Sequence, residues 1–297
     1  MATSAEPLPA ALGSRRQSLR GVRAAALRRG AGVLPHAILI FACFLALAPF
    51  VWSFFGSFKS FKELISSADL LPRTWTVANY VEILTRAHFL DAFRNSLVIA
   101  FTVTAASLFT SSALGYVFAK YRFRGKELLF WLILATMMVP FVVLLVPLYL
   151  TMAQFGLIDQ LAGVVVVGLW TSLGVFMMRQ FIEGIPSELI DAARIDGASE
   201  WLVYRRMILP LVKAPLAALA VLVFLGSWDQ FLWPSAILHN ADKQTLPLLL
   251  YGLRSLYWSR YDLWSAGSML TVIPVMIVYV FGSKYFIRGF AMTGLKG

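Results

Sequence analysis

The sequence predicts an all-α integral membrane protein with six transmembrane helices and both termini in the cytoplasm. Of its 297 residues, 59% are hydrophobic and only 14% are charged, which is too apolar a composition for an ordinary soluble domain. Backbone groups in lipid must be satisfied internally, so long apolar segments are expected to be helices. Six windows contain no charged residue: 37–58, 95–119, 128–158, 160–178, 214–228 and 263–283.

These windows set the expected spans. All but one reach the roughly 18–20 residues that cross a hydrocarbon core of about 30 Å. Window 214–228 is shorter because Lys213 and Asp229 bound it, and a lysine can extend its ammonium group to the interface. The predicted spans are 33–56, 95–119, 128–151, 161–182, 209–232 and 263–285.

The basic residues set the orientation. Lys and Arg concentrate in cytoplasmic loops of membrane proteins, and here most of the 26 basic residues fall in alternate connections. This bias accounts for the net charge of +11 without a nucleic-acid partner. The segments predicted to be cytoplasmic carry Arg15, Arg16, Arg20, Arg23, Arg28, Arg29; Lys120, Arg122, Arg124, Lys126; Arg179, Arg194, Arg205, Arg206; Lys284, Arg288 and Lys296.

The connections give the domain organisation. Residues 1–32 form a basic cytoplasmic tail that precedes a six-span domain, 33–297. The long external connection after the first span has apolar residues at helical spacing, which predicts one or two interfacial helices. Pro140 and Pro147 should kink the third span. The residues that predict the interfacial helices are Val77, Tyr80, Val81, Leu84, Phe89, Leu90 and Phe93.

The sequence contains no recognisable catalytic or cofactor motif. Cys43 is the single cysteine, and His36, His88 and His239 lack metal-ligand spacing. No G-x-x-x-x-G-K-[ST] motif occurs, because Gly125-Lys126 is followed by Glu127. We therefore expect a non-catalytic membrane subunit without a cofactor of its own, in which any use of ATP depends on another polypeptide.

The most informative segment is the polar insert 186–208, between the fourth and fifth spans. Pro186 suits the first turn of a helix and Ser187 can cap it. Glu188 and Asp191 lie near the positive end of the helix dipole. Gly197 is a good place for the helix to end, and a second short helix can begin at Ser199.

This insert has the composition of a docking element. A face with little side-chain bulk lets a helix settle into a groove of a partner, with larger apolar residues as anchors and charges as a rim. The alternative is a solvated cytoplasmic loop with ordinary helix chemistry. The small face comprises Ala192, Ala193, Gly197 and Ala198; the anchors are Leu189, Trp201 and Leu202; the rim is Asp191, Arg194, Asp196 and Glu200.

Candidates for a solute pathway are few. Asp229 is an acidic residue next to a membrane segment, and such a residue is a functional-site candidate. Trp228 and Gln230 flank it, and Asn95 opens the predicted second span. The alternatives are an interfacial aromatic belt for Trp228, an interhelical hydrogen bond for Asp229 and a helix cap for Asn95 and Ser96.

The run DAARIDGASEWLVYRRMILP (191–210) resembles the EAA signature of membrane subunits of ATP-binding-cassette importers, with Asp191 in place of the usual glutamate. In that family this is the coupling helix, which lies in a cleft of the ATPase subunit. Further stretches, among them YRFRGKELLFWLILATMMVP, FLGSWDQFLWP and FIRGFAMTGLKG, are similar to the maltose-type carbohydrate importers. The similarity covers roughly residues 35–297.

The resemblance implies a type I importer permease of the bacterial or archaeal cytoplasmic (inner) membrane. Its expected partners are a second, homologous permease subunit, an ATPase dimer that binds ATP and Mg²⁺, and an extracytoplasmic solute-binding protein. The expected solute is a carbohydrate, with glycerol phosphate or another polyol derivative as the alternative. A stand-alone secondary transporter is a further alternative, which the absence of an inverted sequence repeat disfavours. Coupling is assigned to Glu188, Leu189, Asp191, Ala192, Ala193, Asp196, Gly197, Ala198 and Trp201, and a second ATPase contact to Gly294, Leu295, Lys296 and Gly297.

Overall fold

The computed structural model describes residues 35–86, 88–255 and 260–291. The predicted basic tail, 1–32, and the predicted C-terminal contact, Gly294 to Gly297, lie outside this range. The chain divides into two compact units, Met1–Phe55 and Gly56–Gly297. The described part of the first unit, 35–55, belongs to one apolar helix, Pro35–Gly56, whose side chains are largely exposed, as a span facing lipid requires.

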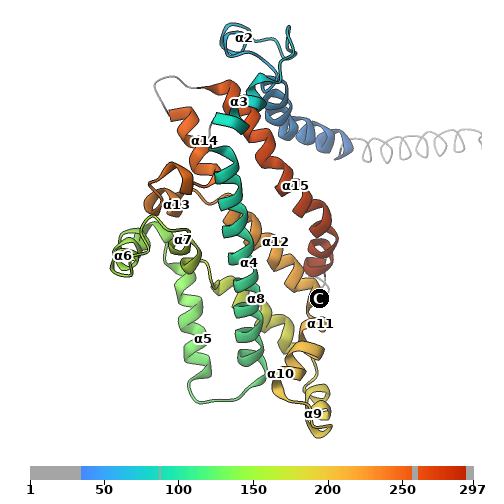
Figure 1. Cartoon of the computed structure of the whole chain (residues 1–297). Coiled ribbons are helices and arrows are strands. Elements are labelled where there is room, and N and C mark those ends of the chain that lie inside the picture. The colour runs from blue at the N-terminus through green and yellow to red at the C-terminus, as the bar shows by residue number, and fades with distance from the viewer. Residues whose placement is uncertain (1–34, 87, 256–259, 292–297) are drawn as a thin grey trace, which may run out of the picture. The chain divides into compact units, whose positions relative to one another are not determined.

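The second unit consists of helices only within the residues described (Figure 1). Its elements are α2 (Phe61–Ser66), α3 (Ala78–Arg86), α4 (Phe89–Lys120), α5 (Lys126–Ala135), η1 (Thr136–Met138), α6 (Phe141–Gln154), α7 (Leu161–Val167), α8 (Ser172–Glu183), α9 (Ser187–Ile195), α10 (Glu200–Val203), η2 (Tyr204–Ile208), α11 (Leu209–Leu211), α12 (Lys213–Trp228), α13 (Leu232–Ile237), η3 (Ala241–Lys243), α14 (Leu246–Ser255) and α15 (Tyr261–Ala291).

Six spans result if each bent helix pair is counted as one. Four helices of the described chain are long and apolar enough to cross a membrane alone: Pro35–Gly56, Phe89–Lys120, Lys213–Ile237 and Tyr261–Gly282. The predicted third and fourth spans are instead pairs, α5–η1 with α6 and α7 with α8, bent by 103° and 43°. The all-α membrane fold is confirmed, and the predicted bend of the third span is present at Pro140, where it is a full break of the helix.

Proline chemistry explains the sharper break. Pro140 has no N–H, and its ring disfavours helical backbone at the preceding residue. Val139 is accordingly extended, with ψ 115°, and α6 starts directly after Pro140. Pro147, in contrast, lies inside α6 without ending it.

The second span begins earlier than predicted. Helix α4 starts at Phe89, so Asn95 and Ser96 lie inside it and do not cap its start. The Asn95 amide instead donates to the carbonyls of Asp242 and Gln244, and Ser96 Oγ accepts from the Leu246 amide. These three bonds fix the connection between α13 and α14 to α4.

Helix α4 is the centre of the second unit, with α8 and α12 packed against it and α15 against α12 (Figure 1). Ser107, Ser111 and Gly115 recur at every fourth position of α4, the small-residue spacing that lets membrane helices approach closely. A Cβ added at Gly115 would lie 2.6 Å from Met178 Cβ and 2.9 Å from the Arg179 nitrogen. Backbones of α4 and α8 are therefore in direct contact.

Candidate functional site

The insert 186–208 folds as the two helices that the sequence predicts, α9 and α10. Gly197 ends the first with φ +81°, a conformation that favours glycine. Ser199 caps the second by accepting from the Leu202 amide at 3.3 Å. The predicted Ser187 cap is wrong, because Ser187 is the first helical residue and Pro186 holds the cap position without a side-chain bond.

One side of this insert packs against the rest of the second unit. Ile190, Val203, Tyr204 and Ile208 are buried against Met178 and Ile182 of α8. Ala193 and Ala198, which were predicted to face a partner, are half-buried against the same cluster. Of the predicted small face, Ala192 and Gly197 are exposed.

The other side offers apolar surface. Leu189 is 47% exposed and Trp201 58%, as expected of anchors, and Leu202 is less exposed at 36%. The most exposed apolar side chain of the insert is Ile195, at 87%, which the sequence reasoning missed. Its signal was present, since it is a large aliphatic residue directly before Asp196-Gly197. The other predicted coupling residues, Glu188, Asp191 and Asp196, are also exposed.

Glu200 differs from the other charges of the predicted rim. Its carboxylate accepts from Arg194 Nε at 2.7 Å, from the Tyr116 hydroxyl at 3.1 Å and from the Tyr121 hydroxyl. Arg194 also donates to Asp191 at 3.1 Å. The Arg194 guanidinium, followed by the Tyr121 hydroxyl, lowers the pKa of the Glu200 carboxyl below its ordinary value. Glu200 thus belongs to a bonded cluster that includes the end of α4.

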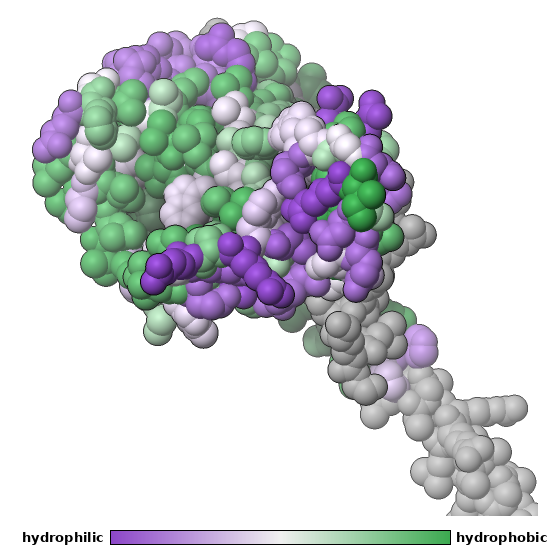
Figure 2. Space-filling model, turned by 90° about the horizontal axis from the view of Figure 1, so that it is seen from below, coloured by the Kyte–Doolittle hydropathy of each residue, from purple (hydrophilic) through white to green (hydrophobic). Residues whose placement is uncertain are grey.

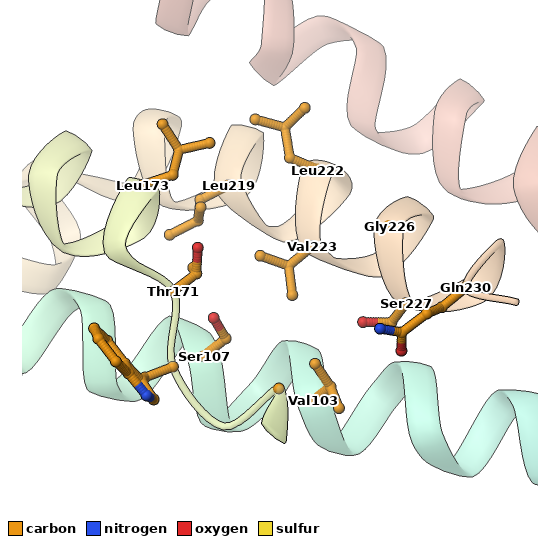
Figure 3. Close-up of a pocket in the computed structure, with 12 residues that line it drawn as sticks. Val103, Ser107, Thr171, Leu173, Leu219, Leu222, Val223, Gly226, Ser227 and Gln230 are labelled. Carbon is orange, nitrogen blue, oxygen red and sulfur yellow. The ribbon is translucent and has the colours of Figure 1, made fainter. Parts of the chain in front are cut away.

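A cavity of ≈ 250 Å³ lies between α4, the break from α7 to α8, and α12. Figure 3 shows Val103 and Ser107 on α4, Thr171 at the break, and Ser227 and Gln230 at the end of α12. Ser107 is fully buried, and its hydroxyl has no hydrogen-bond partner among the described residues. The other lining residues are Gly168, Trp170, Leu173, Leu219, Leu222, Val223 and Gly226.

The break between α7 and α8 shapes this cavity. A helix interrupted in the membrane leaves carbonyls that need partners. One of them, the Leu169 carbonyl, accepts from the Thr110 hydroxyl of α4 at 2.9 Å. This hydrogen bond stabilises the non-helical backbone between α7 and α8 next to α4.

Of the four predicted pathway residues, Gln230 lines the cavity. Asn95 is buried and bonded to the connection between α13 and α14. Trp228 is 1% exposed and stacks on Phe224, with ring centroids 5.9 Å apart. Asp229 is exposed directly after α12.

Ser107 and Ser227 were missed by the sequence reasoning. Ser107 could have been found from its four-residue spacing to Ser111 and Gly115, and Ser227 from its place beside Trp228. Among the described residues, no three His, Cys, Asp or Glu side chains come together as a metal site would require.

Comparisons with known proteins agree with this architecture. Residues 111–290 match the family described as binding-protein-dependent transport system inner membrane component. The arabinooligosaccharides transport system permease protein AraQ of Halalkalibacterium halodurans is 37% identical, over 86% of this chain and 94% of the relative. The lactose transport system permease protein LacG of Rhizobium radiobacter is 30% identical, over 88% and 96%.

Two further matches bear on solute and fold. The sn-glycerol-3-phosphate transport system permease protein UgpE of Brucella abortus is 30% identical, over 88% of this chain and 96% of the relative. The crystal structure of a bacterial ABC transporter involved in the import of the acidic polysaccharide alginate superposes with a TM-score of 0.78 at 24% identity. It covers 87% of this chain and 97% of that one.

Proposed function

Because this chain belongs to the family of binding-protein-dependent transport system inner membrane components, we propose that it is the permease subunit of an ATP-driven carbohydrate importer. It forms half of a solute pathway with a second, homologous permease. Two ATPase subunits hydrolyse ATP to drive transport, and an extracytoplasmic binding protein delivers the solute.

The observation that carries this proposal is the two-sided insert 186–208. Its buried side chains join α4 and α8, whereas the apolar side chains of Leu189, Ile195 and Trp201 are exposed. Large apolar side chains that stay exposed in a polar segment are typical of a surface that contacts a protein partner. A short helix with apolar anchors suits a groove of the ATPase, a helix-in-groove contact.

The cavity supports a neutral, hydroxyl-rich solute. Ser107, Ser227 and Gln230 offer hydroxyl and amide groups, and Trp170 offers an aromatic ring. Among the described residues that line the cavity, none is charged. A phosphate ester would be held best by Arg or Lys, so the cavity favours a sugar over glycerol phosphate.

The proposed mechanism is alternating access. Closure of the ATPase dimer moves the docked insert, and the spans rotate to switch the cavity from the cytoplasmic to the external side. Differential contact of the ATPases with the two states supplies the free energy of the switch.

Gly197 provides the test. A Cβ at Gly197 meets nothing within 4 Å in this chain, so a bulky residue there starts from open space, where a docked partner would obstruct it. We expect Gly197→Trp to abolish ATP-driven solute uptake by the assembled importer while membrane insertion stays intact. Uptake in proteoliposomes measures the effect.

Backbone strain needs its own control. Any L-residue at φ +81° carries a strain of about 1–2 kcal/mol, and Gly197→Ala carries that strain without the bulk. The Ala variant should retain most of the uptake. Wild-type uptake in Gly197→Trp would contradict the proposal, as would equal losses in both variants.

The alternative function, a stand-alone secondary transporter, makes the opposite claim about the isolated chain. It requires ion-driven flux through the purified polypeptide alone, whereas the proposed function requires the ATPases. Solute flux into liposomes that contain only this chain separates the two.

A further inference from the structure

The last turns of α4 and the insert are joined by polar bonds that range from exposed to buried. Tyr116, on the last turns of α4, is 4% exposed, yet its hydroxyl donates to Glu200 at 3.1 Å. Tyr121, directly after α4, donates to the same carboxylate oxygen. Its ring packs edge-on against Tyr116, with centroids 5.5 Å apart. Glu200 is thereby held by one donor on α4, by a second directly after α4, and by Arg194 from α9.

A second bond lies one turn further into α4. Ser112 Oγ and the Tyr204 hydroxyl share a buried hydrogen bond of 2.7 Å. Tyr204 stacks near Tyr116, with centroids 6.0 Å apart. The two bonds lie on one face of α4, because positions 112 and 116 are four residues apart.

The chain changes from α-helix to π-helix directly after α10. Residues Tyr204–Ile208 form a π-helix, which is closed by the Leu209 amide on the Tyr204 carbonyl. Pro210 follows and has no N–H to continue a regular helix. Single π-turns of this kind recur at functional sites. The insert is therefore fixed firmly to α4 and connected through an irregular turn to α12.

We propose that Glu200 is a positioning residue for coupling, which holds α9 and α10 against the end of α4 so that a displacement of the insert moves α4. Helix α4 carries Val103 and Ser107 into the cavity, so this connection reaches the solute pathway. The inference rests on the proposed function, since it needs an ATPase that moves the insert.

The experiment compares variants in the complete importer, reconstituted with its binding protein, second permease and ATPases. Glu200→Gln removes the charge that binds Arg194 and both tyrosines. The double variant Tyr116→Phe/Tyr121→Phe removes only the two donors from the α4 side and leaves the Arg194 pair intact. Glu183→Gln, a carboxylate-to-amide change on α8 outside the cluster, is the matched control.

The measured quantity is solute taken up per ATP hydrolysed, because a merely structural bond would not change it. We expect this ratio to fall roughly threefold to tenfold in Glu200→Gln and in the double variant. That range corresponds to losing charge-assisted hydrogen bonds that are partly screened by solvent. The Glu183→Gln control should keep the wild-type ratio.

Two results would overturn the inference. One is a wild-type ratio in both variants with only a lower melting temperature, which would make the cluster a stability device. The other is loss of the ATPases from the purified Glu200→Gln complex, which would place Glu200 in the docking surface. In either case the Gly197→Trp result still judges the proposed function separately.

Discussion

Single small residues decide how closely the membrane helices of this permease pack. At Gly115 the missing side chain lets α4 lie directly on the backbone of α8. At Gly174 an added Cβ would lie 2.3 Å from Ser111 Oγ. Helix association in lipid depends on such packing, because the apolar lipid gives no hydrophobic driving force.

Gly115→Ala should therefore destabilise the permease. The new methyl group meets backbone atoms of Met178 and Arg179, which cannot rotate away, so α4 and α8 must separate. Overpacking of this kind costs about 1–3 kcal/mol, which should appear as a lower melting temperature of the purified complex. Gly252→Ala in α14 is the control, since its Cβ meets nothing within 4 Å; an equal drop in both would refute the packing argument.

Among the elements, the existence of the spans could be predicted from the sequence, but their ends and bends could not. The charge-free window missed the first turns of α4 because Asp91 and Arg94 are charged. Both keep their charged groups exposed, so the helix can start before the apolar run. Pro140 signalled a break, but its 103° angle depends on packing that no local pattern records.

The site shows the same division. The two short helices of the insert could be predicted because their start and end signals, Gly197 and Ser199 among them, lie within one short segment. The hydrogen bond between Glu200 and Tyr116 could not be predicted, because Tyr116 lies 84 residues earlier in the sequence. The cavity was likewise hidden, because it combines residues of α4, α8 and α12.

Asp159 joins two connections of the chain, the one between α6 and α7 and the one after α13. Asp159, between α6 and α7, accepts from the amides of His239 and Asn240 and pairs with Lys243 at 3.3 Å. Those backbone bonds lower the pKa of Asp159 from 3.8 to about 2. A carboxyl with a lowered pKa stabilises the fold above its unfolded-state pKa, and this contribution is lost as the pH falls through the folded value.

We therefore expect Asp159→Asn to melt at a lower temperature than wild type at pH 7, with the difference shrinking between about pH 4 and pH 2. Asn is the suitable replacement because it tolerates the φ of +55° at this position. Thermal unfolding of both proteins across this pH range is the measurement. A difference that stays constant with pH would show that the charge of Asp159 contributes nothing.

At the scale of the whole molecule, the structure of the second unit agrees with the orientation read from the basic residues. The α4–α5 connection with Arg122 and Arg124 lies at the same end as α9 and α10 (Figure 1). Lys120 donates to the Glu183 carbonyl at 3.3 Å, which joins the two basic connections. Seen from this end, hydrophilic side chains gather over part of the surface beside a hydrophobic region (Figure 2).

The orientation can be measured by labelling. Cys43 is the single cysteine, so a Cys43→Ser background permits one new thiol at a time. Ile195→Cys should react with a membrane-impermeant maleimide in inside-out vesicles and stay unlabelled in intact cells, whereas Leu70→Cys on the predicted external side should do the reverse. Adding the ATPases should then protect Ile195→Cys, because the proposed docking covers it. Labelling of Ile195→Cys from outside intact cells would place the insert on the wrong side of the membrane for any cytoplasmic ATPase to drive it.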